Sequence, residues 1–221
     1  MIRPARSLRP RERGDRSMVV GCLLAALLVG NPLLAQVLLP PDPSVAVGRV
    51  VPFEGFVDEN GRAFATAGAT DGRPWIVSPI YTRCLHTCAP ITQALRSALA
   101  RSGLQTSNYH VVSFSFDPNE TADGLRGFRD KMHLPADWLT LRAETNDALQ
   151  RTLEALDFRT ITVGDGEIDH PNLVAVLAPD RRLAEYLFGI SPSTAPLRAA
   201  LSQPLAGGNS PSSSSPRSAA C

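Results

Sequence analysis

Apolar positions in the middle of the chain follow two periods that alternate along the sequence. Short runs in which apolar residues are continuous or occupy every second position are typical of β-strands. Between these runs, apolar residues recur at every third or fourth position, which is typical of helices with one buried face. We therefore expect strands over 75–81, 110–116, 138–141, 160–163, 173–177 and 183–188, and helices over 90–103, 125–132, 149–156 and 194–202.

Turn signals arrange these elements into an α/β fold. Extended chain over 51–66 flanks Asn60-Gly61, a strong hairpin signal, and predicts an N-terminal β-hairpin. Pro79 interrupts the first central strand, Pro90 is expected to open the next helix, and Pro179-Asp180 joins the last two strands. Because strands that alternate with helices form parallel pairs through right-handed crossovers, we predict a central mixed sheet flanked by helices. This layout is compatible with a thioredoxin-like fold.

The first 40 residues predict an export signal, either a signal peptide or a membrane anchor. Six arginines and two acidic residues occupy the first 16 positions, and residues 18–40 contain no charge. An Arg-rich flank stays on the cytoplasmic side of a membrane, and a helix over the uncharged stretch would reach about 34 Å, enough to cross a bilayer core. Asn31 and Pro32 interrupt the stretch, so that its first part, 18–30, also fits the core of a signal peptide. A cleaved signal and a membrane anchor both remain open, and the chain after residue 40 is expected to be exported.

The C-terminal end has the opposite character. Residues 204–221 are almost all small or polar. Such a segment buries too little apolar area to offset the entropy of ordering, so we predict a disordered tail. The folded unit is then 43–203, and neither Cys22 before it nor Cys221 after it is expected to belong to a preformed site.

Composition and charge exclude some classes of protein. The chain has 22 Lys and Arg against 21 Asp and Glu, which gives no support to nucleic-acid binding, since that needs a basic face. Four cysteines in 221 residues exclude a disulfide-dense scaffold. An apolar fraction of 43% is enough to build a core.

Cys84 and Cys88 carry the clearest chemical signal. They lie between the strand expected over 75–81 and the helix expected to open at Pro90. A helix N-terminus favours the thiolate over the thiol, and the spacing lets both sulfurs face one side of the loop. Two close thiolates of low pKa can close a disulfide or bind a soft cation such as Cu(I). The alternative is a pair of buried, inert cysteines.

A copper site with two sulfurs usually needs a third ligand, and four histidines are available. His86 lies inside the cysteine loop and is expected to point to solvent, while His110 and His133 fit packing or surface positions. His170 lies just before the strand expected over 173–177. In a thioredoxin-like fold that loop lies opposite the cysteine loop, so His170 is the best candidate.

The sequence resembles the Sco/SenC family of copper-binding, thioredoxin-like proteins over about residues 50–190. The shared pieces are Tyr81-Thr82-Arg83-Cys84-x-x-x-Cys88, Phe116-Asp117-Pro118, Trp138-Leu139-Thr140 and Asp169-His170, in that order. The resemblance implies copper ligation by Cys84, Cys88 and His170. It also implies that the protein acts on the outer face of a bacterial or mitochondrial inner membrane. For this chain we expect the periplasmic side of a bacterial inner membrane. There the family helps to deliver copper to the dinuclear copper site of cytochrome c oxidase, and some members act mainly as thiol–disulfide reductases.

The chain departs from the family pattern at two places. The family usually has Pro directly after the second Cys, whereas here Ala89 intervenes before Pro90, which shifts the expected helix start. The family commonly has Ser after its His, whereas here Pro171 follows and restricts His170 toward extended geometry. A cis peptide at Pro171 is one alternative.

Two acidic residues near these motifs have open roles. Asp117 precedes a proline after a strand, which is first of all a turn signal, with a role in orienting a ligand as the alternative. Asp169 either hydrogen-bonds a ring nitrogen of His170 or lies in solvent.

The leading functional hypothesis is a copper chaperone that passes its ion to a cytochrome c oxidase copper-site subunit or another copper carrier. The alternative is a thiol–disulfide oxidoreductase that uses Cys84 and Cys88 to reduce an exported client. A peroxidase fits less well, because Thr82 and Arg83 are not convincingly placed for peroxide chemistry.

Overall fold

The computed structural model describes residues 38–64 and 71–202 of the 221-residue chain. The expectations for the basic N-terminus, the signal or anchor before residue 38, Cys22, the tail and Cys221 lie outside these residues. Within the two described ranges, no helix is long and apolar enough to cross a membrane.

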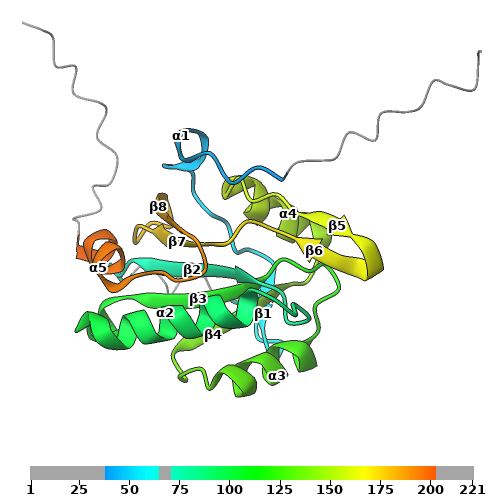
Figure 1. Cartoon of the computed structure of the whole chain (residues 1–221), viewed down its shortest axis with the longest axis horizontal. Helices are drawn as coiled ribbons and strands as arrows, with labels where there is room; N and C mark the ends of the chain where they lie inside the picture. Colours follow the sequence, from blue (N-terminus) through cyan, green and yellow to red (C-terminus); the bar gives the residue numbers. More distant parts are fainter. Residues whose placement is uncertain (1–37, 65–70, 203–221) are drawn as a thin grey trace, which may run out of the picture. The chain divides into compact units, whose positions relative to one another are not determined.

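Six strands form a mixed central sheet in the order β1-β4-β3-β2-β7-β8 (Figure 1). The β2–β3 and β3–β4 pairs are parallel, whereas β1–β4, β2–β7 and β7–β8 are antiparallel. The parallel centre and the antiparallel hairpin at one side agree with the predicted topology. The strands are β1 (Phe56–Asp58), β2 (Trp75–Ile80), β3 (His110–Ser115), β4 (Trp138–Ala143), β7 (Leu173–Leu177) and β8 (Leu183–Phe188).

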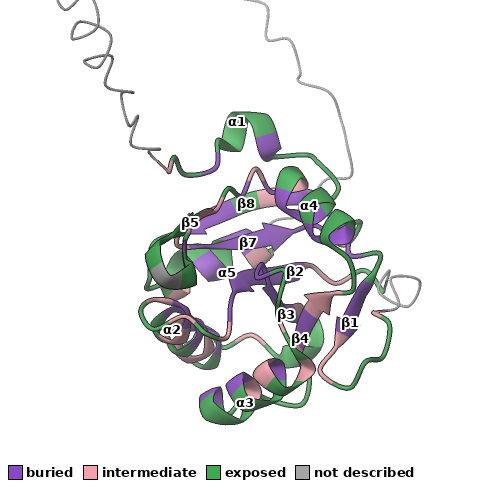
Figure 2. Cartoon of the chain, turned by 90° about the vertical axis from the view of Figure 1, so that its right-hand side faces the viewer, coloured by how far each residue is buried: buried purple, intermediate pink, exposed green. Residues whose placement is uncertain are grey.

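Helices cover both faces of this sheet. Helices α2 and α4 lie on opposite sides of it (Figure 2), and α2 contacts both α3 and α5. Thr121 and Thr145 cap α3 and α4 with their hydroxyls, and Gly103, at φ 73°, ends α2 as its position in the sequence predicts. The helices are α1 (Pro43–Ala46), α2 (Cys88–Ser102), α3 (Ala122–Met132), α4 (Asn146–Ala155) and α5 (Thr194–Ser202), with short 3-10 turns η3 (Thr106–Asn108) and η4 (Gly164–Gly166).

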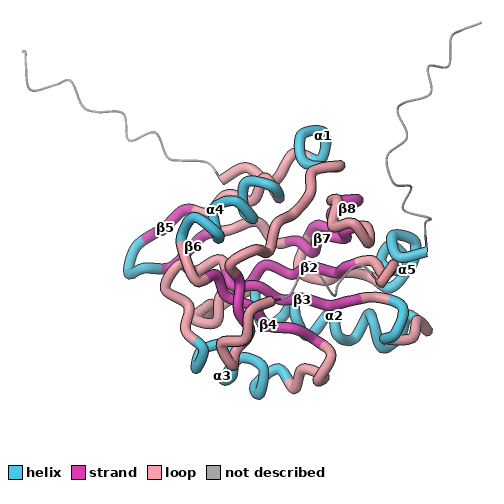
Figure 3. The backbone as a smooth tube through the Cα atoms, turned by 180° about the vertical axis from the view of Figure 1, so that it is seen from behind, coloured by secondary structure: helices cyan, strands magenta, loops and turns pink. Residues whose placement is uncertain are grey.

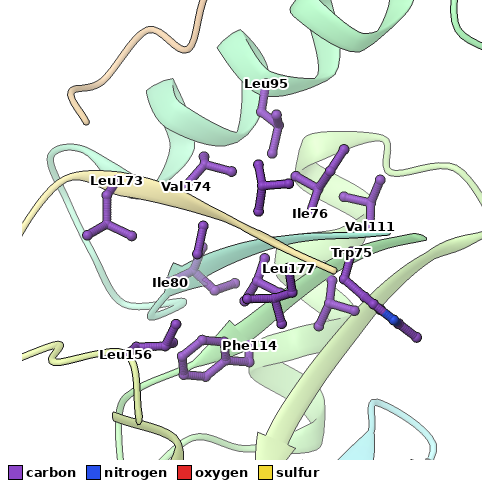
Figure 4. Close-up of a cluster of buried hydrophobic side chains, with 14 of the residues drawn as sticks. Trp75, Ile76, Ile80, Leu95, Val111, Phe114, Leu156, Leu173, Val174 and Leu177 are labelled. Atoms are coloured by element: carbon purple, nitrogen blue, oxygen red, sulfur yellow. The ribbon is translucent and has the colours of Figure 1, made fainter. Parts of the chain in front are cut away.

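The core fills the space between the sheet and the helices. Every residue of β2 and β7 is buried, as expected for strands covered on both faces (Figure 4). Leu95 of α2 and Phe114 of β3 have no exposed surface. Burial of each such side chain contributes about 1.5–3 kcal/mol. The core therefore fixes the end of β2 from which the cysteine loop leaves.

Pro79 does not interrupt β2, contrary to expectation. It lies in the strand in register with Phe114 of β3. His110 N donates to Pro74 O, and Phe116 N donates to Ile80 O. The backbone N–H and C=O groups of even-numbered residues in β2 therefore point toward β3, and those of odd-numbered residues point toward β7. Pro79 therefore faces the β7 side, where pairing already stops at Val77, so its missing N–H leaves no ladder bond unmade.

The strand expected over 160–163 does not join the central sheet. It forms β5 (Ile161–Val163), which pairs only with β6 (Glu167–Asp169), a strand missing from the sequence prediction. This β5–β6 hairpin lies beside α4 (Figure 3). The N-terminal hairpin is present in reduced form: the turn at Asn60-Gly61 returns the chain, with a single bridge between Val57 and Ala63.

Candidate metal centre

Three segments far apart in the sequence meet at the carboxyl end of β2. The loop after β2 carries Cys84, the first residue of α2 is Cys88, and the connection from β6 to β7 carries His170. One ligand atom from each lies within 4.8 Å of the other two. No other cluster of three histidine, cysteine or acidic ligands occurs in residues 38–64 and 71–202.

Helix α2 begins at Cys88 and not at Pro90. Thr87 is the N-cap, so Cys88 lies in the first turn and Pro90 two positions later, where its missing N–H has no helical partner to lose. Cys84 is fixed by a turn in which its backbone N donates to Tyr81 O at 3.1 Å. Both cysteines are free thiols; Cys84 is half-buried and Cys88 is buried.

The two sulfurs differ in acidity. The pKa of Cys84 is strongly lowered because the Cys88 thiol donates to its sulfur and backbone N–H groups add further hydrogen bonds. The pKa of Cys88 is raised, first by its hydrogen bond to Cys84 and then by burial. The lowered pKa favours the thiolate at Cys84, and the raised pKa favours the thiol at Cys88. The sequence predicts a low pKa for both sulfurs; the shift at Cys84 is in that direction and the shift at Cys88 is in the opposite one, because the buried sulfur donates its proton to its neighbour.

The imidazole of His170 is oriented by its own backbone neighbour. Nδ1 lies 3.1 Å from the carbonyl oxygen of Pro171, which can only accept, so Nδ1 carries the proton. Nε2 then carries no proton and lies 3.5 Å from the hydroxyl of Thr87 and 3.9 Å from the Sγ of Cys88. The ring packs against Phe116, with centroids 4.8 Å apart. An unprotonated Nε2 held beside the two sulfurs is the tautomer that a metal ligand needs.

Asp169 does not orient this ring. Asp169 is exposed at the end of β6, where it pairs in register with Ile161. The hydrogen-bond partner of Nδ1 is the Pro171 carbonyl oxygen instead. The peptide bond before Pro171 is trans, since the described ranges contain no cis peptide bond.

The family assignment follows from sequence comparison. A model of the SCO1/SenC family matches residues 48–203, which include the whole site. The chain belongs to the SCO1/SenC family. A comparison with curated proteins gives no match.

Solved structures of other proteins share this Sco-family fold. A candidate electron transfer protein from Aquifex aeolicus VF5 is 32% identical, covers 70% of this chain and 92% of its own, and has a TM-score of 0.65. A SCO1/SenC family lipoprotein from Bacillus anthracis str. Ames is 17% identical, with 70% and 94% covered and a TM-score of 0.62. ScoI of Arabidopsis thaliana with copper bound is 13% identical, with 68% and 97% covered and a TM-score of 0.59. The last two similarities show the thioredoxin-like fold alone.

The other histidines of this Sco-family chain do not reach the sulfurs. His86 is exposed and its Nε2 lies 3.1 Å from Glu167 Oε1. His110 stacks on Trp75 and bonds to Asp71. His133 ends α3 in the left-handed conformation, at φ 49°. Their predicted surface or packing roles agree with these positions.

Two acidic residues hold the cysteine loop: Asp117, for which the sequence left a turn or an orienting role open, and Glu120, which sequence reasoning missed. Asp117 forms the expected turn by accepting from Asn119 N at 2.8 Å, but its side chain, only 1% exposed, also pairs with the guanidinium of Arg83. Glu120 accepts from both the backbone N and the hydroxyl of Thr82, at 3.0 and 2.7 Å. A signal was available: both follow β3, the parallel neighbour of the strand that leads to Cys84.

A hollow of about 230 Å³ gives access to the site. It lies between the cysteine loop and the β5–β6 hairpin, and Cys84, His86, Glu167 and His170 contribute to its lining. Cys84 is therefore the sulfur that an incoming group reaches first.

Proposed function

We propose that this Sco-family chain is a copper chaperone. It binds one copper ion through Cys84, Cys88 and His170 and delivers the ion to the dinuclear copper site of cytochrome c oxidase during assembly of the respiratory complex. The observation that carries the proposal is the convergence of two sulfurs and one imidazole nitrogen within 4.8 Å, from three separate segments.

The donor set suits copper. Thiolate sulfur selects soft ions such as Cu(I), and imidazole also suits Cu(II). The proton on Nδ1 of His170 leaves Nε2 ready to coordinate, and the thiolate of Cys84 needs no deprotonation. Cys88 must lose its proton, so copper binding releases a proton to solvent. Family membership and the copper found in the Arabidopsis ScoI structure support the same ion.

Transfer would proceed by ligand exchange at the hollow. Leu85, between the two cysteines, is 88% exposed, so the loop tip can contact another protein directly. A recipient that approaches from this side meets Cys84 before the buried Cys88. The partner is then a cytochrome c oxidase copper-site subunit or another copper carrier.

The proposed location is the periplasmic side of the bacterial inner membrane. The Arg-rich start and the uncharged stretch over 18–40 support export, with the domain either anchored or released after cleavage. A SCO1/SenC family protein from Bacillus anthracis is a lipoprotein, which supports a location at a membrane.

Copper titration of the full chain tests the proposal. Wild-type protein should bind one equivalent, and Cys84→Ser, Cys88→Ser and His170→Ala should each weaken binding, with loss of the sulfur-to-Cu(II) charge-transfer absorption in the cysteine variants. His133→Ala is a matched control, because that residue is exposed at the end of α3 and does not belong to the cluster of Cys84, Cys88 and His170. Preference for Zn(II) over both copper states, or equal binding by His170→Ala and His133→Ala, would refute the copper site.

A second function, thiol–disulfide exchange, is favoured by the unequal sulfurs. The accessible thiolate of Cys84 can attack a client disulfide, forming a mixed disulfide and releasing one client thiolate. Cys88 then gives up its proton and attacks Cys84, which releases the second client sulfur and leaves a Cys84–Cys88 disulfide for a dithiol reductant to reset. Turnover with a disulfide substrate by wild type and His170→Ala alike, without stoichiometric copper binding, would favour this function over the first.

A further inference from the structure

The loop between β3 and α3 (116–121) holds the segment that carries Cys84. Both carboxylate oxygens of Glu120 accept two hydrogen bonds each. One oxygen accepts from Thr82 N at 3.0 Å and from Ser115 Oγ at 2.8 Å. The other accepts from Thr82 Oγ1 at 2.7 Å and from Thr121 N at 3.0 Å. Glu120 thus joins the end of β3, the cap of α3 and the cysteine loop.

Thr82 transmits this anchoring to the metal centre. It lies inside the turn that is closed by the bond from Cys84 N to Tyr81 O. The same loop contacts the other side of the site, because Phe116 packs on the ring of His170 with centroids 4.8 Å apart. One short segment therefore contacts the supports of both Cys84 and His170.

Gly124 of α3 provides an independent observation. A Cβ at this position would lie 2.8 Å from Thr82 Oγ1 and would overlap Glu120 Oε1. Glycine within a helix costs about 1 kcal/mol relative to alanine. At Gly127 of the same helix, by contrast, a Cβ would meet nothing within 4 Å. The absence of a side chain at Gly124 leaves the room that the bond between Glu120 and Thr82 occupies.

We propose that Glu120 is a positioning residue that sets the placement of the Cys84 sulfur relative to Cys88 and His170. Its carboxylate fixes the backbone and side chain of Thr82, and Gly124 leaves the space for that contact. The effect on copper rests on the function proposed above, whereas the effect on the thiols does not.

Four variants of the full chain test this role. Glu120→Gln keeps the size of the side chain but replaces one accepting oxygen by a donor, and Thr82→Val removes the hydroxyl. Gly124→Ala crowds the contact without removing a polar group, and Gly127→Ala is its matched control with the same gain in helix propensity. The measurements are the alkylation rate of Cys84 in reduced, copper-free protein, the Cys84–Cys88 reduction potential, the copper affinity and the Cu(II) absorption spectrum.

Glu120→Gln and Gly124→Ala should each weaken copper binding by about tenfold and shift the Cu(II) spectrum, as is usual when a group that orients a ligand is lost. Both should also change the alkylation rate and the reduction potential, and Gly127→Ala should change none of the four. The Glu120→Gln/Thr82→Val double variant should lose less than the product of the two single effects, because both remove one contact.

Wild-type thiol reactivity, potential and spectrum in folded Glu120→Gln would overturn the proposal, as would equal effects of Gly124→Ala and Gly127→Ala. If Gly124→Ala fails to fold, the Glu120–Thr82 double variant decides alone, and additive effects refute the coupling. If wild-type protein binds no copper, the proposed function fails, while the thiol measurements still decide the role of Glu120.

Discussion

His110 and His170 lie at opposite ends of the central strands and make opposite use of the same side chain. Both rings pack on an aromatic neighbour: His110 on Trp75 with centroids 3.9 Å apart, and His170 on Phe116 at 4.8 Å. At His110, Nε2 is taken by Asp71 at 3.0 Å. At His170 the backbone oxygen of Pro171 accepts from Nδ1, and the unprotonated Nε2 lies 3.5 Å from the Thr87 hydroxyl and 3.9 Å from the Cys88 sulfur, with no carboxylate beside it. The partner of each ring nitrogen, and not aromatic packing, separates a structural histidine from a candidate ligand.

The largest expected effect is on copper affinity. His170→Ala should lower the affinity for Cu(II) by about a hundredfold or more, since loss of groups that merely orient a ligand already costs about 10- to 100-fold. His110→Ala should leave the affinity unchanged, because that ring lies at the other end of the β2–β3 pair. Competition with a chelator of known affinity measures both variants. Similar losses in the two would remove the distinction drawn between the histidines.

The next effect is on thiol reactivity at acid pH. A cysteine with the ordinary pKa of 9.0 loses about tenfold in thiolate for each unit of pH below that value. The lowered pKa of Cys84 keeps its thiolate populated, so its alkylation rate in copper-free protein should stay nearly constant from about pH 8 to pH 5. Mass spectrometry of the modified peptides provides the measurement, with Cys88 as internal control, because its raised pKa keeps it unreactive over the same range. A tenfold fall per unit at Cys84 would contradict the assigned thiolate.

A smaller effect is expected on stability at the opposite end of the sheet. His110→Ala removes the stacked contact with Trp75 and the bond to Asp71, and such an aromatic pair is worth about 0.5–1.5 kcal/mol. Denaturant unfolding should show a loss of about 1 kcal/mol. His133→Ala, on an exposed helix end, should show almost none. An unchanged free energy of unfolding in His110→Ala would mean that the stacked pair does not stabilise the fold.

The smallest effect is the pH dependence of the same cluster. Hydrogen bonds from Arg73 first, and then from His110, hold the pKa of Asp71 well below its ordinary 3.8. A carboxylate with a lowered folded-state pKa stabilises the fold above the unfolded-state pKa, and that contribution disappears as the pH falls through the folded-state pKa. Asp71→Asn should therefore destabilise the protein slightly at pH 7, and the difference should shrink in strong acid. A difference that grows in acid would reverse the assigned sign.

The sequence predicted the parts of this molecule that depend on local pattern. The periodicity of apolar residues located five of the six strands of the central sheet. The sixth, the short β1, was expected only as part of a hairpin. The order of the elements then brought His170 to the cysteine loop. The resemblance to the Sco/SenC family supplied the identity of the three residues, and their convergence within 4.8 Å agrees with it.

What the sequence could not give depends on contacts between distant residues. Nothing local distinguishes Glu120 from other acidic residues near a helix start, because its partner Thr82 is 38 positions away. The choice between Asp169 and the Pro171 carbonyl as partner of Nδ1 depends on the course of a single loop. The unequal acidity of Cys84 and Cys88 follows first from the hydrogen bond between their sulfurs and then from the burial of Cys88, neither of which the spacing alone reveals.

The β5–β6 hairpin shares no strand pairing with the six-stranded sheet and forms one wall of the hollow beside Cys84. Its turn, at Gly164–Gly166, can therefore lengthen or change composition without disturbing the register of the six-stranded sheet. Among related proteins, substitutions in this hairpin would change the surface that a recipient contacts. Cys84, Cys88 and His170 would stay the same.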